Sequence, residues 1–402
     1  MKRSRFRIIN RKKAIKNISL LVFCCIILTT VAVKAVSYSL KKFNEYTISK
    51  EAKSTTLKDP SSNTDEPYNS PVVDNSKPVE TSTAVKSTEV LLSAVGDCTI
   101  GTDSKFDYAT SLPEVVSNSN KDFSYYFENV YSIFESDDVT IANLETTFTD
   151  STDKAEKQFN FKASSDFAKS LTLGSIEGVN LSNNHIYDYK EKGFKDTKLA
   201  LQKEKVNYFG EGSKWTPKIK GQSFGFLGYR GWSTEQSFLN GVKKDIAELK
   251  KTNSVVIINF HWGNESQYYP IDAQTQLARF AIDNGADIIL GHHPHVIQGI
   301  EQYKNRIIAY SLGNFCFGGN SNPKDKTTFI FQSNLKFTSN KLTAIGVRVI
   351  PCSISSVDYK NDYRPTPLKG DAKITTLSSL NTLSQNSGFK ISDKFFYINV
   401  NN

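Results

Sequence analysis

The sequence predicts an α/β fold with a large sheet content, preceded by one membrane-spanning helix. From Val90 onward, short apolar runs typical of buried strands alternate with amphipathic helical segments. Compact polar motifs directly follow several of these strands, as in α/β proteins whose functional loops gather at the carboxyl ends of the strands. One apolar run near the N-terminus has the length needed to cross a bilayer.

The first residues predict a cytoplasmic segment followed by a membrane anchor. Residues 1–16 contain eight Lys and Arg and no acidic residue, and the apolar run lies within residues 17–36. The positive-inside rule keeps the basic flank in the cytoplasm and places the remaining chain outside the cell membrane. A cleaved signal peptide is the alternative. We favour the uncleaved single-pass anchor because Val33-Lys34-Ala35 is a poor cleavage site.

The charge distribution argues against a nucleic-acid partner. The chain has a net charge of +9, of which the first sixteen residues supply +8, so that the remainder carries +1 (9 − 8). The folded part is therefore nearly neutral, and we expect no binding to nucleic acid.

The cysteines do not form a regular disulfide framework. Cys24 and Cys25 lie in the apolar run, which leaves Cys98, Cys316 and Cys352. This odd number without regular spacing favours unpaired, buried cysteines, although a pair of Cys98 and Cys316 stays open.

The composition divides the rest of the chain into a stalk, a domain and an extension. Residues 37–89 are rich in Ser, Thr, Pro, Asp and Lys and predict a disordered stalk. Residues 90–355 are expected to form the main domain, and residues 356–402 a C-terminal extension that packs on it.

Apolar runs bounded by polar or glycine-containing segments define the expected strands. In chain order these are Val90–Val95, Val139–Ala142, Gly178–Leu181, Val206–Phe209, Phe224–Tyr229, Val255–Phe260, Ala286–Leu290, Val296–Ile300, Arg306–Tyr310, Thr328–Phe331, Thr343–Ile350 and Phe395–Val400. Helical spacing predicts helices over Tyr125–Phe134, Asp166–Leu173, Lys190–Lys205, Asp272–Asn284 and Lys373–Ser384. Asp272 is the expected N-cap of its helix, which ends near Gly285.

The polar motifs contain all five histidines of the chain, which lie between His185 and His295. Because the carboxyl ends of strands converge, we expect the motif residues to share one cleft. Carboxylate, carboxamide and imidazole groups together suit a divalent Mn, Fe or Zn ion. The residues concerned are Asp97, Glu145, Asn184, His185, His261, His293 and His295.

The order and content of these motifs resemble the bacterial CapA family, typified by the poly-γ-glutamate capsule synthesis proteins. The resemblance covers about residues 90–351. Its carriers are Gly96-Asp97, Asn143-Leu144-Glu145, Asn183-Asn184-His185 with Asp188, His261-Trp262-Gly263-Asn264-Glu265, Gly291-His292-His293-Pro294-His295 and Tyr310-Ser311-Leu312-Gly313-Asn314-Phe315. The resemblance implies the calcineurin-like metallophosphoesterase fold, an αββα two-sheet sandwich.

The same resemblance implies a role for each metal ligand. Asp97 and His295 would bind a first metal, Glu145 would bridge two metals, and the second would be bound by Asn184, His261 and His293. The chain departs from the metallophosphoesterase pattern in two places. Thr99 stands where those enzymes carry a histidine, and Glu145 stands where they carry an aspartate.

The resemblance also implies that His185 donates a proton to a leaving group or polarises the substrate. Asp188 is the second candidate catalytic residue, and orienting His185 or capping the following helix are its alternative roles. His292 is expected to pack behind the site.

Four further residues are candidates for substrate binding. These are Asn143, Trp262, Arg230 and Asn314. For the two asparagines, hydrogen bonding to loop backbone is the alternative. For Trp262 the alternatives are forming a wall of the cleft or packing in the core.

Three functions remain open from the sequence. The family resemblance implies a membrane-anchored, extracytoplasmic protein in the synthesis or export of an anionic surface polymer, with membrane-embedded capsule synthesis subunits as partners. A metal-dependent phosphoesterase at the cell surface and a non-catalytic polymer-binding protein are the alternatives. The chain has no Gly-x-x-x-x-Gly-Lys-Ser/Thr motif, which excludes ATP-dependent monomer activation through a P-loop.

Overall fold

The computed structural model of this 402-residue chain describes residues 86–252 and 254–400. The expected cytoplasmic segment, the membrane anchor and most of the expected stalk lie outside these residues. Within the described ranges, no helix has both the length and the apolar character needed to cross a membrane.

The larger sheet has nine strands, seven of which follow the order β16-β15-β14-β1-β2-β5-β6, while β13 pairs with β1 and β17 pairs with β15. Its strands are β1 Ser87–Thr99, β2 Val139–Leu144, β5 Gly178–Asn180, β6 Asn207–Phe209, β13 Asn314–Phe317, β14 Thr327–Thr338, β15 Lys341–Ser353, β16 Thr366–Pro367 and β17 Phe396–Asn399. Strands β1, β2, β5 and β6 are mutually parallel, so their carboxyl ends meet at one edge.

The smaller sheet has six strands in the order β11-β12-β10-β9-β8-β7. They are β7 Lys218–Ile219, β8 Gln222–Arg230, β9 Val255–His261, β10 Ile288–His292, β11 Ile300–Tyr303 and β12 Arg306–Ala309. Strands β8, β9, β10 and β12 are again parallel. A separate pair is formed by β3 (Thr147–Phe148) and β4 (Lys162–Ala163).

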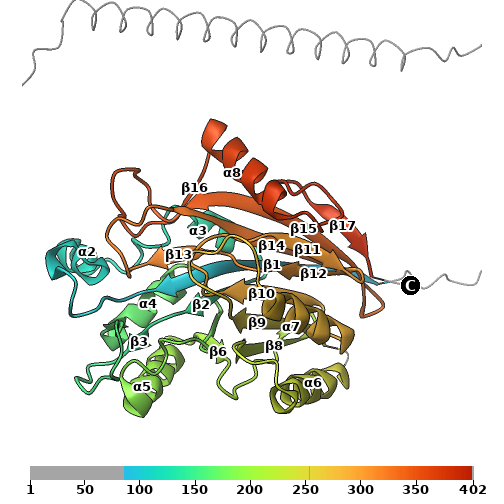
Figure 1. The fold of residues 1–402 in the computed structure, drawn as a ribbon, viewed down its shortest axis with the longest axis horizontal. Helices are drawn as coiled ribbons and strands as arrows, with labels where there is room; N and C mark the ends of the chain where they lie inside the picture. Colours follow the sequence, from blue (N-terminus) through green and yellow to red (C-terminus); the bar gives the residue numbers. More distant parts are fainter. Residues whose placement is uncertain (1–85, 253, 401–402) are drawn as a thin grey trace, which may run out of the picture. The chain divides into compact units, whose positions relative to one another are not determined.

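The strands and helices that form the layers of the fold are labelled in Figure 1. Side chains that alternate along the strands pack into the cores between these layers. On β9, Val255 and Ile257 join an apolar core that also contains Leu92 of β1, and this core lies between the two sheets. The alternate β9 residues Val256 and Ile258 pack in a second core with residues of α6 (Gln236–Lys250) and α7 (Asp272–Asp283). Because both faces of β9 are covered, its sequence is a continuous apolar run rather than an alternating one.

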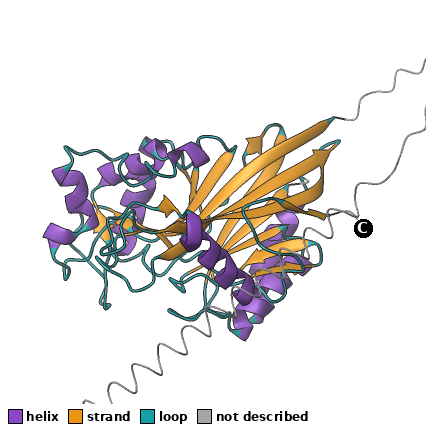
Figure 2. Cartoon of the chain, turned by 90° about the horizontal axis from the view of Figure 1, so that it is seen from above, coloured by secondary structure: helices purple, strands orange, loops and turns teal. Residues whose placement is uncertain are grey.

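Helices cover the outer faces of both sheets (Figure 2). The outer face of the larger sheet packs on a third core contributed by α2, α3, α4 and α5, so the order of the layers is helix, sheet, sheet, helix. The helices are α2 Leu112–Asn118, α3 Tyr131–Phe134, α4 Lys169–Leu173, α5 Lys190–Lys203, α6 Gln236–Lys250, α7 Asp272–Asp283 and α8 Gly370–Leu383. The three cysteines of the described residues are free and buried, as expected.

Three local predictions were wrong. Only α3 of the expected helix Tyr125–Phe134 is helical, because the preceding residues form turns that still bury Tyr126 and Phe127. Residues 296–299 form no strand, since Gln298 N–H bonds to the carbonyl of Ser311 in a loop and the strand begins only at Ile300.

The third wrong prediction concerns the start of α7. Its N-cap is Ile271, whose N–H donates to the Gln274 side chain at 3.0 Å, so Asp272 is the first helical residue rather than the cap. The sequence analysis also missed α6, although Val242, Ile246 and Leu249 form a buried helical stripe.

Two glycines allow backbone segments to approach closely beside the polar motifs. A Cβ atom on Gly96 would lie 1.9 Å from the carbonyl oxygen of Gly313, and one on Gly291 would lie 1.9 Å from that of Tyr310. No side chain fits at either position without moving the neighbouring backbone.

Gly291→Ala is therefore expected to destabilise the protein by about 2 kcal/mol or more, because the methyl group meets backbone rather than a movable side chain. Gly241→Ala is the matched control, since a Cβ there meets nothing within 4 Å. Gly241 is in the interior of α6, so this change should stabilise the protein by about 1 kcal/mol. Urea unfolding measures both effects. Equal stability of the two variants would contradict the close approach at Gly291.

Candidate metal centre

The carboxyl ends of strands from both sheets meet at one cluster of polar side chains. Each expected ligand lies at or just after the end of a strand, as the motif pattern predicts. Asp97 is in β1, Glu145 follows β2, Asn184 and His185 follow β5, His261 ends β9, and His293 and His295 follow β10.

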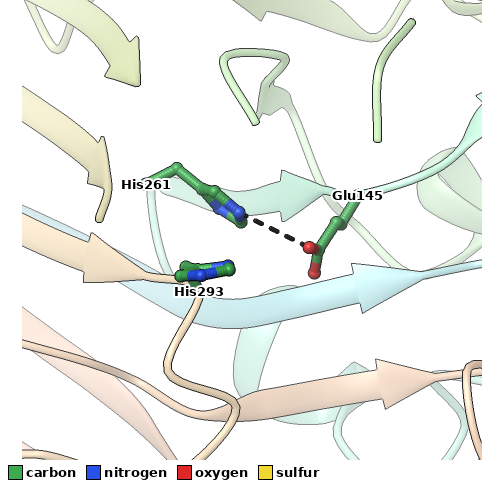
Figure 3. Close-up of side chains that lie close together, drawn as sticks. All are labelled: Glu145, His261 and His293. Carbon is green, nitrogen blue, oxygen red and sulfur yellow. Dashed lines mark ion pairs between the residues drawn. The ribbon is translucent and has the colours of Figure 1, made fainter. Parts of the chain in front are cut away.

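Three sets of three side chains could each hold a metal ion, and two of them share Glu145. These two are Glu145, His261 and His293 (Figure 3), and Asp97, Glu145 and His295, whereas the third is the exposed Glu265 with His293 and His295. Within each set, one ligand atom from each residue lies within 4.8 Å of the others. A carboxylate common to two ligand sets is the arrangement needed for two ions ~3.5–4 Å apart.

The buried carboxylate of Glu145 lacks hydrogen-bond partners among the described residues, which suits a cation ligand. Both of its carboxylate oxygens are buried, and neither has a hydrogen-bond partner among the described residues. Its Oε1 lies 3.5 Å from Nε2 of His261 and 4.0 Å from Nε2 of both His185 and His295. These distances exceed a hydrogen bond but suit ligands of a shared ion with metal–ligand bonds of about 2.0–2.2 Å. A divalent ion would supply the missing partner of this carboxylate.

The two carboxylates are in opposite electrostatic situations. Burial and the nearby charge of Asp97 raise the pKa of Glu145 well above its usual value. Burial also opposes ionisation of Asp97, but the neighbouring His292 and His295, whose Nδ1 atoms lie 3.6 Å and 3.3 Å from its carboxylate oxygens, hold its pKa well below the usual range. His292 is buried and its Nε2 contacts Asn259 Oδ1 at 2.8 Å, so it packs behind Asp97 as expected.

The two histidines of the set Glu145, His261 and His293 favour the neutral imidazole form. Burial and the neighbouring His293 lower the pKa of His261 well below its usual value. Burial and His295 lower the pKa of His293 to about 4. A neutral imidazole has the free lone pair that a metal requires. The Oδ1 of Asn184 lies 2.7 Å from Nε2 of His261, so Asn184 is also placed to contribute an oxygen ligand.

The loop that carries His293 and His295 has an unusual backbone. Both residues have positive φ angles, +95° and +58°, a region that non-glycine residues rarely adopt. Contacts within the site hold this conformation. The N–H of His293 donates to Asp97 Oδ2 at 3.1 Å, and Asn314 Nδ2 donates to the carbonyl of His295 at 3.1 Å. Strain of this kind is typical of functional loops.

His185 has a buried partner on the side away from Glu145. Its Nδ1 lies 2.7 Å from Asp188 Oδ2, so Asp188 orients the ring and leaves Nε2 toward the ligand cluster. Lys157 Nζ bonds to Asp188 Oδ1 at 2.6 Å and to the carbonyl of Asn184 at 2.7 Å. Burial lowers the pKa of His185, although Asp188 opposes this effect. The sequence analysis missed Lys157, which lies in a loop and follows no strand.

The two asparagines named as candidates for substrate binding each contact one of the candidate metal-ligating side chains. Asn143 is fully buried, donates to Asp97 Oδ1 at 2.7 Å and accepts from Asn180 Nδ2 at 2.8 Å. Asn314 is also buried, and its Oδ1 contacts Nδ1 of His295 at 2.9 Å. Their amide groups are thus occupied by protein partners.

Trp262 is in the core rather than in the site. It is fully buried, stacks on Phe260 with ring centroids 4.8 Å apart, and donates to the carbonyl of Tyr310 at 2.9 Å. Trp232 lies beside the ligands instead, with its ring centroid 4.7 Å from that of His293, and 49% of this residue is exposed. The position of Trp232 just after β8 could have revealed it, because the same strand-end rule applies there.

Arg230 lies at the carboxyl end of β8, opposite His261 in the strand register. Its side chain is 42% exposed, and its guanidinium bonds to Glu211 Oε2 at 2.9 Å. The Arg230 charge is therefore already paired at the edge of the site.

Comparison with known proteins gives consistent matches over this region. The model of the family described as bacterial capsule synthesis protein PGA_cap matches residues 91–319. The PGA biosynthesis protein CapA of Bacillus subtilis (strain 168) is 31% identical over 291 residues, which cover 66% of this chain and 73% of that protein. The capsule biosynthesis protein CapA of Bacillus anthracis is 31% identical over 256 residues, covering 57% and 60%. A probable polyglutamine synthesis accessory protein of Mycobacterium tuberculosis (strain ATCC 25618 / H37Rv) is 24% identical, covering 54% and 66%.

Glu145→Gln is expected to abolish metal binding because it removes the carboxylate that two of the ligand sets share. In EDTA the variant should unfold at the same temperature as the wild type or higher, since it lacks the repulsion between Glu145 and Asp97. Mn²⁺ at 100 times its Kd should stabilise the folded wild type by roughly 2–3 kcal/mol and so raise its unfolding temperature. The variant should show no such rise. Elemental analysis and thermal unfolding measure these changes.

Glu191→Gln is the matched control, because it makes the same chemical change at an exposed glutamate that belongs to none of the three sets. This variant should keep its metal. Equal metal content in wild type and Glu145→Gln would contradict the shared-ligand arrangement.

Proposed function

Since the chain belongs to the PGA_cap family of bacterial capsule synthesis proteins, we propose that it takes part in the biosynthesis or export of a poly-γ-glutamate capsule. The observation that carries this proposal is the extent of the family match. Residues 91–319 contain every side chain of the three ligand sets, so the family resemblance and the candidate metal centre coincide. The names of the Bacillus relatives, PGA biosynthesis protein and capsule biosynthesis protein, point to the same process.

The centre is proposed to hold two divalent ions, Mn, Fe or Zn, in a metallophosphoesterase-like fold. Asp97 and His295 would hold the first ion, and Asn184, His261 and His293 the second, with Glu145 between them. The layer order helix, sheet, sheet, helix supports this fold. Bound ions would activate water and stabilise negative charge on a transferring group.

The residues around the ions have separate tasks in this proposal. Asp188 fixes the His185 ring through Nδ1, so His185 Nε2 can transfer a proton to a leaving group. Asn143 and Asn314 hold Asp97 and His295 in place. Thr99 is buried in β1 and cannot replace the imidazole that metallophosphoesterases carry there, so the first ion would have fewer protein ligands than the second.

The location proposed for this centre is the outer face of the cell membrane. The apolar run within residues 17–36 would anchor the chain and residues 37–89 would act as a stalk. The domain would then work beside membrane-embedded capsule synthesis subunits on the anionic polymer. The basic flank of the apolar run supports this orientation.

A strain that lacks the gene should regain surface polymer with the wild-type chain but not with His293→Ala or Asn184→Ala, because each variant removes a ligand of the second ion. Lys243→Ala, an exposed change on α6, is the control and should restore polymer fully. Surface polymer is measured by glutamate release after acid hydrolysis, with immunoblots to equalise protein levels. Full restoration by His293→Ala would contradict a role for the metal centre.

A metal-dependent phosphoesterase is the second candidate, favoured by the His185–Asp188 pair beside the shared carboxylate. In this case the Mn²⁺-loaded protein hydrolyses bis(p-nitrophenyl) phosphate. His185→Ala should lower kcat by about 10²–10⁴-fold while metal content stays unchanged, because the proton donor is not a ligand. Asp188→Asn should give a smaller loss. If the metal-loaded wild type shows no hydrolysis of phosphodiesters or monoesters, this second candidate is wrong.

A further inference from the structure

A cavity beside the candidate metal centre is not used by any role described so far. Its volume is about 490 Å³, and Phe106, Phe159, Phe317 and Lys105 are among the residues that line it. These four residues are called the aromatic groove below. They come from two loops and the end of β13, and none of them follows a strand as the metal ligands do.

The aromatic groove is adjacent to the ligand cluster on two sides. The ring centroid of Phe317 lies 5.5 Å from that of His295. Phe159 stacks on Phe161 at 6.2 Å, and Phe161 in turn packs on His185 at 4.6 Å. A molecule in the groove would therefore border His295 directly and would be separated from His185, the proposed proton donor, by the ring of Phe161.

The charge of the groove comes from Lys105. Its side chain is exposed, its Nζ lies 5.8 Å from the ring centroid of Phe159, and it bonds to the carbonyl of Gln158. Among residues 86–252 and 254–400, Lys105 forms no ion pair with a carboxylate. The acidic residue of the same cavity, Asp107, accepts the N–H of Ala109 at 3.1 Å in a local cap. The ammonium of Lys105 thus remains available to an anion.

These groups match one class of ligand. Aromatic rings pack well against methylene groups, and a lysine at the mouth recognises a carboxylate as a point charge. A chain that carries carboxylates between short apolar spacers satisfies both requirements. A compact inorganic anion would satisfy only the lysine and leave the three rings without a partner.

We propose that the aromatic groove binds a segment of a carboxylate-bearing polymer of the poly-γ-glutamate type and leads the neighbouring part of the chain across the metal centre. This inference rests on the proposed capsule function and adds the place where the polymer binds. Binding in the groove is non-covalent and needs no change at the metal ligands.

The test is binding of a fluorescent γ-glutamyl oligomer to the full chain, measured by anisotropy with and without EDTA. Phe159→Ala and Lys105→Ala should each weaken binding by about tenfold, which corresponds to the loss of one important contact. Phe159→Tyr keeps the ring and should bind within about twofold of the wild type. An oligomer of neutral glutamine of equal length should bind much more weakly, because Lys105 then has no charge partner.

Lys154→Ala is the matched control for charge. Lys154 is exposed and bonds to Ser104 Oγ at 3.2 Å, near Lys105 but not in the lining of the groove. Lys154→Ala should bind the γ-glutamyl oligomer with an affinity within about twofold of the wild type if the groove recognises the oligomer through specific contacts. Equal weakening by Lys154→Ala and Lys105→Ala would indicate general attraction to positive charge and overturn the proposal.

Other outcomes would also overturn it. These are unchanged affinity in Phe159→Ala, equal affinity for the neutral oligomer, and no measurable binding by the wild type. The groove proposal can be contradicted while the proposed capsule function stands, because His293→Ala would then still fail to restore surface polymer in cells. Conversely, restoration by His293→Ala would remove the function of the metal centre whatever the groove variants bind.

Discussion

The buried carboxylate of Glu145 is the constraint around which the meeting edge of the two sheets is organised. Its two oxygens have no hydrogen-bond partner in the described part of the chain, and Asp97 adds a second negative charge nearby. A buried charge without a partner is costly, and proteins keep such groups mainly where a ligand or ion supplies the compensation. The imidazoles that converge on Glu145 Oε1 at 3.5–4.0 Å leave space for such an ion.

The rest of the fold can be understood as support for that arrangement. Parallel strands in both sheets bring their carboxyl ends to the same place, and Gly96 and Gly291 allow the backbone to approach there without side chains. Within the larger sheet, the side chain of Asn143 in β2 links Asp97 in β1 to Asn180 in β5. Hydrogen bonds to Asp97 and from Asn314 hold the positive φ angles of His293 and His295 in the loop after β10. This strained backbone costs stability locally and fixes the candidate ligands in place.

Some of this site could be predicted from the sequence because strand ends obey a simple rule. Asp97, Glu145 and His261 each terminate an apolar run, and parallel packing brings such ends together. The same reasoning could have excluded Trp262. Adjacent strand residues point to opposite faces, so if His261 faces the ligands, its neighbour faces the core. Lys157 could not be found in this way, because its loop is placed only by tertiary contacts with Asp188.

The aromatic residues of the groove could not be identified from the sequence either. Phe106, Phe159 and Phe317 look like ordinary core residues in the sequence. Only the packing of distant loops reveals that Phe317 lies against His295 and that Phe106 and Phe159 pack on Phe161, the neighbour of His185. The start of α7 is a smaller example. Asp272 is a good capping residue by type, yet the cap lies one residue earlier, where the Ile271 N–H donates to the side chain of Gln274.

Anomalous X-ray scattering from crystals of the protein grown with Mn²⁺ would test the central claim most directly. The account predicts two manganese peaks ~3.5–4 Å apart on either side of Glu145. One peak should lie beside His261 and His293, and a weaker one should lie beside Asp97 and His295, where Thr99 supplies no imidazole. A crystal without a peak at Glu145, in which water or protein donors satisfy both carboxylate oxygens, would contradict it.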